Sequence, residues 1–175
     1  MADLKRIRLL VTDVDGVLTD GRITYDSTGA ESKSFHVRDG SGLKYWLRAG
    51  HQAALLTGRQ SAVVDRRAAE LGIALVEQGA KDKRPALERI LKAAGCTGDE
   101  AAYVGDDLPD LPVFAAVGYR VAVADAVAEL REAADYVTRT PGGGGAVREV
   151  IELILRAQGR WATILERYGD GSAGA

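Results

Sequence analysis

Short apolar runs alternate along the chain with segments in which apolar residues recur every three or four positions. The continuous runs predict buried strands at 7–12, 52–56, 73–76, 101–104 and 119–124. The helical spacing predicts helices at 40–49, 60–71, 87–94, 147–155 and 161–168. Because strands that alternate with helices are typical of βαβ units, the pattern predicts an α/β fold with a parallel sheet.

One segment departs from this alternation. Two β-prone runs, 22–26 and 31–37, flank a turn-forming cluster and predict a β-hairpin. We expect the hairpin to be an insertion at about 21–37. No linker divides the remaining sequence, so we expect one domain over 1–158. The segment 159–175 is then a C-terminal tail, with a short helix followed by a disordered end.

The composition is that of a globular domain. The chain has 175 residues, of which 46% are hydrophobic and 27% are charged, enough for one core. With 23 Lys and Arg against 25 Asp and Glu, the net charge is −2, so we expect neither nucleic acid nor a membrane surface as a partner. No apolar run approaches the roughly 20 residues of a membrane span. Cys96 is the only cysteine, which excludes an internal disulfide and favours the cytoplasm.

Acidic residues follow two of the predicted strands. Asp13 and Asp15 come after the first strand, and Asp106 and Asp107 come after the fourth. Since ligands of open α/β sheets bind at the carboxyl ends of the strands, we expect these acids to meet at one edge. Carboxylates gathered there repel one another, and Mg²⁺ would offset that repulsion because it prefers oxygen ligands. An acid after a strand also commonly caps a helix, an interpretation that stays open for Asp107 and Asp110.

Polar and basic residues follow the other strands at the same edge. Thr57 offers a hydroxyl, Gly58 lets backbone N–H groups approach an anion, and Lys83 offers a positive charge. Together they suit the oxygens of a phosphoryl group. Each residue alone is more commonly a cap or a solvated side chain, and Lys81 competes with Lys83 for the same role.

The order of these residues resembles the motifs of the haloacid dehalogenase-like phosphatases. The segment 13–19 looks like the first motif of that family, and Thr57, Lys83 and the segment 105–110 match the second, third and fourth motifs in order. The resemblance runs from about residue 7 to residue 161. It implies a Rossmann-like three-layer α/β/α sandwich with a central, mostly parallel sheet, to which the hairpin is a small insertion.

The resemblance also implies a mechanism. Asp13 attacks phosphorus in line and forms an aspartyl phosphate. Asp15 protonates the leaving oxygen and then activates water to hydrolyse the intermediate. Thr57 and Lys83 hold the phosphoryl oxygens, which makes these four the expected catalytic residues.

Mg²⁺ is the cofactor that the resemblance implies. Its expected ligands are the Asp13 carboxylate, the Asp15 backbone carbonyl and Asp106. We expect Asp107 to support the metal site or to orient Lys83, and Asp110 to be a further supporting residue.

Further segments resemble the capless branch of the same family, at 35–40, 78–79 and 141–149. That branch lacks a cap domain. It includes phosphatases of 3-deoxy-D-manno-octulosonate 8-phosphate (KDO 8-phosphate), a precursor of lipopolysaccharide, and of nine-carbon sugar acids such as KDN or sialic acid 9-phosphate. Arg59 resembles the octulosonate enzymes at a position where the nine-carbon relatives tend to have Glu, so the resemblance favours the octulosonate.

A sugar acid carries a carboxylate as well as a phosphate, so its site needs a second cationic contact. Arg59, next to Gly58, can pair with such a carboxylate. Arg67 and Arg148 are further candidates for substrate binding, and the glycine run at 142–145 could approach a neighbouring subunit's pocket. Surface positions for these arginines and a flexible connector for the glycine run remain equally open.

Capless members of the family close their sites with neighbouring subunits, commonly as tetramers built on the hairpins. Ile23, Tyr25 and Phe35 give this hairpin apolar faces that a lone hairpin cannot bury. We therefore expect a homo-oligomer and, on the resemblance, a tetramer. The alternative is a hairpin that folds onto its own domain.

Two other classes of protein stay open. A signalling receiver domain also places acids, Thr and Lys on a parallel sheet, but it is phosphorylated after the third strand, where this chain has the segment 79–81. A receiver domain also lacks the residues that follow the first acids in this chain, at 16–19. A non-catalytic interaction protein on this fold is the second alternative, and the filled catalytic positions count against it.

Overall fold

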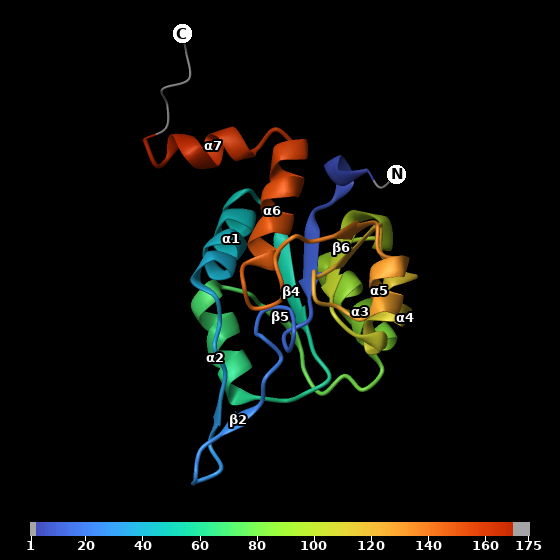
Figure 1. Ribbon diagram of the computed structural model, residues 1–175. Coiled ribbons are helices and arrows are strands. Elements are labelled where there is room, and N and C mark those ends of the chain that lie inside the picture. The colour runs from blue at the N-terminus through green and yellow to red at the C-terminus, as the bar shows by residue number, and fades with distance from the viewer. Residues whose placement is uncertain (1–2, 170–175) are drawn as a thin grey trace.

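A six-stranded parallel sheet forms the centre of the computed structural model, which describes residues 3–169 (Figure 1). The strand order is β5-β4-β1-β6-β7-β8, and every neighbouring pair runs parallel. The strands are β1 (Leu9–Thr12), β4 (Gln52–Leu56), β5 (Leu75–Glu77), β6 (Ala101–Gly105), β7 (Tyr119–Ala122) and β8 (Tyr136–Val137). The predicted parallel sheet is therefore confirmed.

Helices cover both faces of the sheet and complete a three-layer sandwich (Figure 1). One face carries α1 (Val37–Arg48), α2 (Ala62–Leu71) and α6 (Ala146–Ala157), and the other carries α3 (Lys83–Ala94), α4 (Leu111–Phe114) and α5 (Ala128–Ala133). A last helix, α7 (Trp161–Glu166), follows α6, and single 3₁₀ turns lie at Leu4–Arg6, Gly98–Glu100 and Leu108–Asp110.

The sequence explains why the strands and helices begin where they do. All residues of β1 and β6 are buried, as expected for strands covered by helices on both faces. The Ser61 hydroxyl accepts a hydrogen bond from the Val63 N–H and so begins α2, and the Asp82 carboxylate accepts one from the Arg84 N–H and begins α3. These caps fix where the loops before α2 and α3 end.

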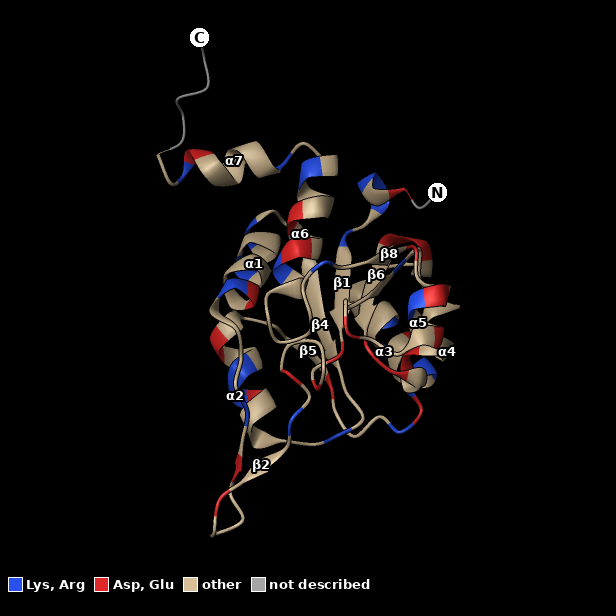
Figure 2. Cartoon of the chain, viewed as in Figure 1, with Lys and Arg blue, Asp and Glu red and all other residues tan. Residues whose placement is uncertain are grey.

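The register of the sheet brings three loops to one edge. Thr12, the last residue of β1, pairs with Leu55 of β4 on one side and with Val104 of β6 on the other. The Asp13 N–H then donates to the Val104 carbonyl at 3.0 Å. The segments that follow the three strands therefore leave the sheet side by side. Figure 2 shows acidic residues in the loops that meet at this edge.

The expected hairpin is present but shorter than its sequence pattern. β2 (Thr24–Tyr25) and β3 (Glu31–Ser32) pair antiparallel and project beyond the carboxyl edge of the sheet (Figure 1). The run expected to extend as a strand to residue 37 instead enters α1, because the His36 Nδ1 atom accepts a hydrogen bond from the Arg38 N–H and caps the helix. The helix expected to start at residue 40 therefore starts at Val37.

Sequence periodicity missed three short elements, α4, α5 and β8. None is longer than six residues, and β8 has two, so neither a helical nor an alternating period can develop. In the expected tail, Trp161 of α7 is buried and its ring meets Tyr45 of α1 edge to face, with 6.1 Å between centroids. Residues 170–175, on which the expected disordered end falls, lie outside the described residues. None of the helices within 3–169 has the length and apolar content needed to cross a membrane.

Candidate active site

A pocket of about 220 Å³ lies at the carboxyl edge of the sheet, where the loops after β1, β4, β5 and β6 meet. Most of the candidate residues from all four motifs line it. The lining residues are Asp13, Asp15, Thr57, Gly58, Arg59, Ala80, Lys81, Lys83, Asp106, Asp107, Pro109 and Asp110.

A buried lysine forms the centre of this pocket. The Lys83 side chain is 4% exposed, and its Nζ donates to Asp13 Oδ2 at 2.7 Å and to Asp110 Oδ1 at 2.6 Å. Burial by itself would lower the pKa of Lys83, but the charges of Asp13 and Asp110 raise it above its ordinary value. Lys83 is therefore a fixed positive charge, whereas Lys81 lies exposed at the pocket mouth, and the geometry favours Lys83 for phosphate binding.

Asp110 orients this lysine. It is fully buried, and its Oδ1 also accepts a hydrogen bond from the Tyr103 hydroxyl at 2.6 Å. Its Oδ2 accepts the N–H groups of Asp106 at 2.9 Å and of Asp107 at 3.3 Å. Both oxygens are thus engaged within the protein, and Asp110 connects the loop after β6 to Lys83.

Asp107 does not reach the lysine. Its carboxylate accepts the Leu108 N–H at 2.8 Å and caps the 3₁₀ turn at Leu108–Asp110. The structure therefore corrects the expectation that Asp107 orients Lys83. Because Asp107 caps the turn, its carboxylate points at the backbone of that turn. The helix-cap interpretation, left open for both acids, holds for Asp107.

Two carboxylates remain for a metal ion. Single carboxylate oxygens of Asp13, Asp106 and Asp110 lie within 4.8 Å of one another. Among the described residues, each oxygen of Asp110 already accepts two hydrogen bonds, whereas each oxygen of Asp13 accepts only one. Asp106 Oδ1 is buried and has no hydrogen-bond partner within residues 3–169. A buried carboxylate oxygen without a partner costs free energy, and an all-oxygen site of this kind fits Mg²⁺.

The backbone at Gly16 leaves room for the side chain of Asp106. Gly16 has a φ of +94°, and a β-carbon there would lie 2.0 Å from Asp106 Oδ2. Only glycine permits both this left-handed conformation and the close approach of the two loops. The first and fourth motifs are therefore in direct contact at the expected metal site.

The pKa values of Asp106 and Asp13 in the pocket are raised mainly by burial and further by repulsion between the acids. Burial, followed by the charges of Asp13 and Asp110, raises the pKa of Asp106 to about 8. Burial also raises the pKa of Asp13 to about 6, although Lys83 opposes the shift. A divalent cation between Asp13 and Asp106 would favour their ionised forms, which supports the expected metal site.

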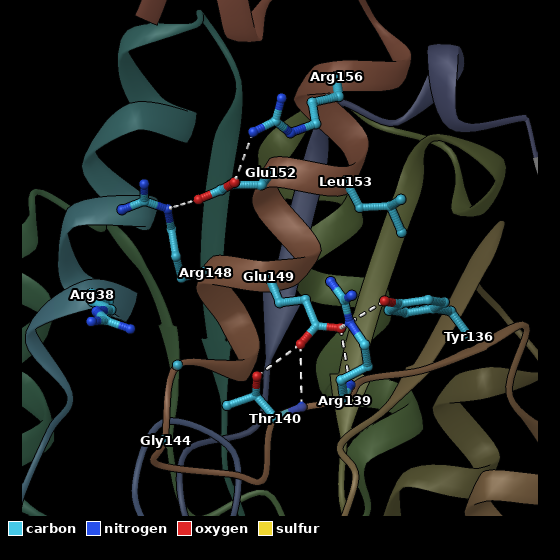
Figure 3. A pocket seen from close by; sticks show the side chains of 11 residues that line it. Arg38, Tyr136, Arg139, Thr140, Gly144, Arg148, Glu149, Glu152, Leu153 and Arg156 are labelled. Carbon is cyan, nitrogen blue, oxygen red and sulfur yellow. Dashed lines mark hydrogen bonds and ion pairs between the residues drawn. The ribbon is translucent and has the colours of Figure 1, made fainter. Parts of the chain in front are cut away.

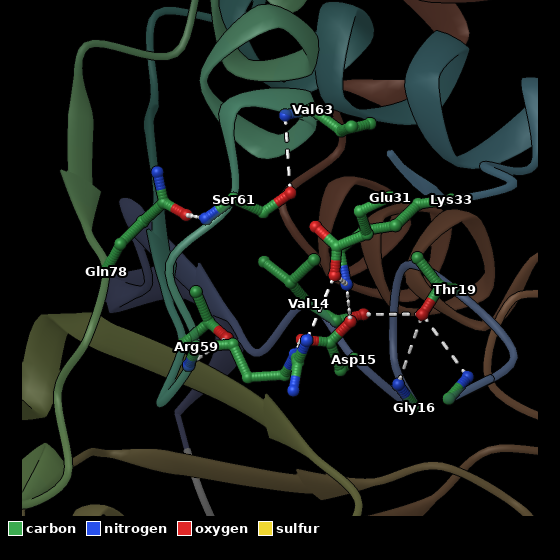
Figure 4. Close-up of polar contacts among 12 residues, drawn as sticks. Val14, Asp15, Gly16, Thr19, Glu31, Lys33, Arg59, Ser61, Val63 and Gln78 are labelled. Carbon is green, nitrogen blue, oxygen red and sulfur yellow. Dashed lines mark hydrogen bonds and ion pairs between the residues drawn. The ribbon is translucent and has the colours of Figure 1, made fainter. Parts of the chain in front are cut away.

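The second acid of the first motif contacts the hairpin rather than the other acids. Lys33 Nζ donates to Asp15 Oδ1, and Arg59 Nε lies 3.9 Å from Asp15 Oδ2 (Figure 4). Arg59 also donates to the Tyr25 hydroxyl at 3.0 Å and to Glu31 Oε1 at 3.1 Å. Asp15 is thus surrounded by two cations, one from the hairpin and one from the loop after β4.

Thr57 and Gly58 occupy the positions expected of phosphate-binding residues. Thr57 is 2% exposed, and its hydroxyl accepts the Arg59 N–H at 3.3 Å. Its backbone carbonyl accepts the Ala80 N–H at 3.1 Å, which joins the loop after β4 to the loop before α3. Both residues line the same pocket as Asp13, and their binding of phosphate stays a prediction.

Arg67 does not reach this pocket within one chain. It packs against α1, where its Nη2 lies 2.3 Å from the point that a β-carbon on Gly40 would occupy. Its guanidinium covers the Phe35 ring at 5.4 Å and pairs with Glu70 at 3.4 Å. The position of α2 against α1 turns Arg67 away from the phosphate edge, so a substrate contact from the same chain is not supported.

Arg148 also lies elsewhere, in a cavity of about 550 Å³ beside α6 (Figure 3). Its Nε pairs with Glu152 at 2.7 Å, and its guanidinium stacks over the rings of Tyr45 and Trp161 at 4.8 and 5.2 Å. Arg156 pairs with the same glutamate and covers the same Trp161 ring. This cavity is larger than the acidic pocket, but these two arginines are used in packing, and neither of them lines the acidic pocket.

The glycine run is neither a flexible connector nor a free loop. The Gly142 N–H donates to Asp125 at 2.8 Å, and the Gly143 N–H donates to the Val17 carbonyl at 2.9 Å. A β-carbon on Gly142 would lie 1.7 Å from the Gly16 carbonyl oxygen. The run therefore packs on the first-motif loop of its own chain and supports that loop from outside the pocket.

Sequence reasoning missed three polar residues of the site. Lys33 and Glu31 contact Asp15 and Arg59 from the hairpin, and Tyr103 contacts Asp110 from within β6. None stands in a recognisable motif. Tyr103 lies in an apolar run, and Lys33 lies in a polar hairpin, so only tertiary structure brings them to the site.

Comparisons with known proteins agree with this geometry. A family model of haloacid dehalogenase-like hydrolases matches residues 75–151. The 3-deoxy-D-manno-octulosonate 8-phosphate phosphatase of Haemophilus influenzae is 50% identical over 157 residues, 90% of this chain and 87% of its own.

Solved structures of such phosphatases superpose closely. The enzyme of Moraxella catarrhalis, in complex with magnesium, phosphate and KDO, gives a TM-score of 0.92 at 45% identity and covers 95% of each chain. The cobalt-bound Haemophilus influenzae enzyme gives a TM-score of 0.87 at 50% identity and covers 90% of this chain and 92% of that chain. The similarity thus extends over nearly the whole chain.

Proposed function

The chain belongs to the haloacid dehalogenase-like hydrolases, within the family of 3-deoxy-D-manno-octulosonate 8-phosphate phosphatases, and from this premise we propose that it hydrolyses KDO 8-phosphate to KDO and phosphate. The observation that carries the proposal is the contact of Asp13 with Lys83 beside Asp106 in one small pocket. This pocket brings together a nucleophile, a phosphate-binding cation and a metal ligand. Relatives about half identical to this chain carry the same activity in their names.

Asp13 is the nucleophile. Its Oδ1 accepts the Val14 N–H at 2.6 Å, and its Oδ2 accepts from Lys83. These two contacts fix the carboxylate at the pocket floor, ready for in-line attack on phosphorus. With a pKa of about 6, the carboxyl group is largely ionised at neutral pH, as a nucleophile must be.

Asp15 exchanges the proton. It passes a proton to the leaving sugar oxygen as the P–O bond breaks and the bond from Asp13 to phosphorus forms. It then takes a proton from the water that hydrolyses the aspartyl phosphate, which restores both acids. Asp15 lines the same pocket as Asp13 and Lys83, so it can reach a leaving group bound there.

Thr57, Gly58 and Lys83 hold the phosphoryl oxygens through a hydroxyl, a backbone N–H and an ammonium group. Asp13, Asp106 and the backbone carbonyl of Asp15 would hold Mg²⁺. When bound, Mg²⁺ supplies positive charge that offsets the charge of the nucleophile and the phosphate.

Arg59 is the candidate for the substrate carboxylate. Its side chain is 42% exposed at the pocket mouth, beyond Asp15. A guanidinium there can pair bidentately with a carboxylate of a sugar acid. The hydrogen bonds to Tyr25 and Glu31 orient the guanidinium toward the mouth.

A substrate panel tests the proposal. We expect Mg²⁺-dependent release of phosphate with the highest kcat/KM on KDO 8-phosphate, lower values on nine-carbon sugar acid 9-phosphates, and none with EDTA. A preference for a nine-carbon substrate would contradict the proposed specificity. No turnover of any phosphate ester would instead favour a receiver-like or non-catalytic protein.

We further propose a homotetramer built on the hairpins and a cytoplasmic location. Ile23 is 39% and Tyr25 is 57% exposed, although each is apolar enough to be covered by another subunit. The single cysteine, Cys96, is a free thiol, as is common in reducing compartments. We also propose that residues 1–158 form the hydrolase domain and 159–175 a tail.

A further inference from the structure

A buried lysine in the exposed hairpin is the starting point. The Lys33 side chain is 1% exposed, although its neighbours on the hairpin face solvent. A buried ammonium group is costly unless anions surround it. Here Lys33 Nζ bonds to Asp15 Oδ1 and lies 3.5 Å from Glu31 Oε1. The hairpin thus brings a cation to the second acid of the first motif.

The two oxygens of Asp15 have different surroundings (Figure 4). Oδ1 accepts from Lys33. Oδ2 is buried, has no hydrogen-bond partner within residues 3–169, and lies 3.9 Å from Arg59 Nε. Since Asp15 lines the pocket, one oxygen is anchored while the other is left for a ligand.

Glu31 keeps Lys33 in this position. Its carboxylate accepts from Arg59 at 3.1 Å and lies beside Lys33, so it joins the two cations that contact Asp15. A hydrogen bond from the Ser61 side chain, and then the contacts with Arg59 and Lys33, lower the pKa of Glu31. The glutamate therefore stays ionised and offsets one of the two positive charges.

We propose that Lys33 is a positioning residue for the leaving-group step: it anchors Asp15 Oδ1 so that Oδ2 meets the leaving oxygen of the substrate. The proposal rests on the proposed phosphatase function. In the step itself, the P–O bond to the leaving group breaks, the proton moves from Asp15 to that oxygen, and Asp13 forms the new bond to phosphorus. Lys33 touches none of the reacting atoms and acts through Asp15.

The dependence of the rate on the leaving group separates this role from a structural one. A poor leaving group, such as a sugar alcohol, needs a proton as it departs, whereas p-nitrophenolate leaves readily without one. Loss of positioning therefore slows alkyl phosphates selectively. Loss of hairpin structure alone would slow both classes of ester alike.

The test compares Lys33→Met with the wild-type chain on a series of phosphate monoesters, from p-nitrophenyl phosphate to simple alkyl phosphates and the sugar acid phosphate. The measured quantity is kcat/KM, which covers steps up to departure of the leaving group and leaves out hydrolysis of the aspartyl phosphate. We expect kcat/KM to fall about 10- to 100-fold on the alkyl esters and less than about 3-fold on p-nitrophenyl phosphate. The plot of log kcat/KM against leaving-group pKa should become steeper.

Further variants keep the test decisive. Lys33→Arg retains a cation and should recover most of the activity on alkyl esters, and Lys33→Gln replaces Lys33→Met if the latter fails to fold. Lys92→Met, at an exposed position of α3, is the matched control and should leave the plot unchanged. An equal loss on all esters, or no loss, overturns the positioning role. A wild-type chain inactive on every ester would instead overturn the proposed function.

Discussion

At the scale of the residue, the site depends on one lysine held between two carboxylates. Lys83 Nζ contacts Asp13 and Asp110 at 2.7 and 2.6 Å, and Asp110 in turn binds the backbone after β6. Each member of this group is buried, so removing any one leaves an unpaired group in a low-dielectric surrounding. Stability and chemistry are therefore coupled at these positions.

Replacing the nucleophile should abolish turnover in a chain that still folds, although Lys83 then keeps only one of its two buried anions. Asp13→Asn keeps the shape of the side chain but removes the attacking oxygen charge, so we expect kcat to fall by about 10⁴-fold or more on every phosphate ester. Asp99→Asn, at an exposed position in the turn at Gly98–Glu100, is the matched control. Phosphate release by Asp13→Asn at a rate near that of the wild-type chain would contradict the nucleophile assignment.

Removing the lysine's other partner should destabilise the protein. We expect Asp110→Asn to lower the free energy of unfolding by about 3 kcal/mol, because it leaves Lys83 with one buried anion where it had two. Tyr103→Phe removes only the hydroxyl that donates to Asp110 and should cost about 1 kcal/mol. Urea unfolding followed by circular dichroism measures both. Equal losses in the two variants would contradict the central place of Asp110.

Metal binding should release a proton at neutral pH. Burial and neighbouring charges raise the pKa of Asp106 to about 8, so below that pH its carboxyl group is mostly protonated in the metal-free protein. A bound Mg²⁺ displaces that proton. We expect proton release close to one per ion near pH 7, falling toward zero by about pH 9, with apparent affinity rising up to about pH 8.

Calorimetry in buffers of different ionisation enthalpy measures this release. Asp106→Asn should lose both the tight Mg²⁺ binding and the associated proton. Mg²⁺ affinity independent of pH between 7 and 9 would show that Asp106 is already ionised.

At the scale of the element, loops support one another across the carboxyl edge of the sheet. The glycine run before α6 packs on the loop after β1, and that loop in turn touches Asp106 after β6. Three segments far apart in the sequence thus set the position of the metal-binding acids. A substitution in the glycine run should therefore affect the metal-binding acids through backbone contacts alone.

Gly142→Ala tests this transmission. A β-carbon at position 142 would lie 1.7 Å from the Gly16 carbonyl oxygen, and backbone must move to relieve that overlap. We expect a loss of stability of about 2 kcal/mol or more and a weaker affinity for Mg²⁺. Gly144→Ala is the matched control, since its nearest neighbour is 3.1 Å away and needs to shift only slightly. Thermal unfolding with and without Mg²⁺ reports both effects.

At the scale of the whole molecule, one chain leaves its site open on the side of the hairpin. Within residues 3–169 the fold has three layers and no separate domain over the pocket (Figure 1). The hairpin projects from this edge with Ile23 and Tyr25 exposed. In the proposed tetramer, another copy of the chain would cover the pocket on this side.

Light scattering coupled to size exclusion tests the assembly. We expect a mass about four times 18.6 kDa for the wild-type chain and a smaller species for Ile23→Asp. Val137→Asp is the matched control, because Val137 of β8 is exposed to nearly the same degree, 38% against 39%, but lies outside the hairpin. A monomeric wild-type chain would contradict the proposal.

The sequence by itself determined the local features of this protein. Apolar runs and helical spacing depend on nearby residues, so they predicted the long strands and helices, and only short elements such as α5 and β8 escaped them. The acids at the ends of β1 and β6, together with Lys83, were found because their place after a strand is itself a local property. The parallel sheet followed from the same pattern, and its three-layer arrangement followed from the family resemblance.

Tertiary structure decided which side chains meet. Lys83 contacts Asp110 and not Asp107. Arg67 packs between α2 and α1 instead of facing the pocket. Lys33 of the hairpin contacts Asp15. These contacts join residues whose spacing in the sequence follows neither the helical nor the strand period, so the sequence pattern does not predict them. They depend on the register of parallel strands and on how each loop packs on the next, and those are properties of the folded chain alone.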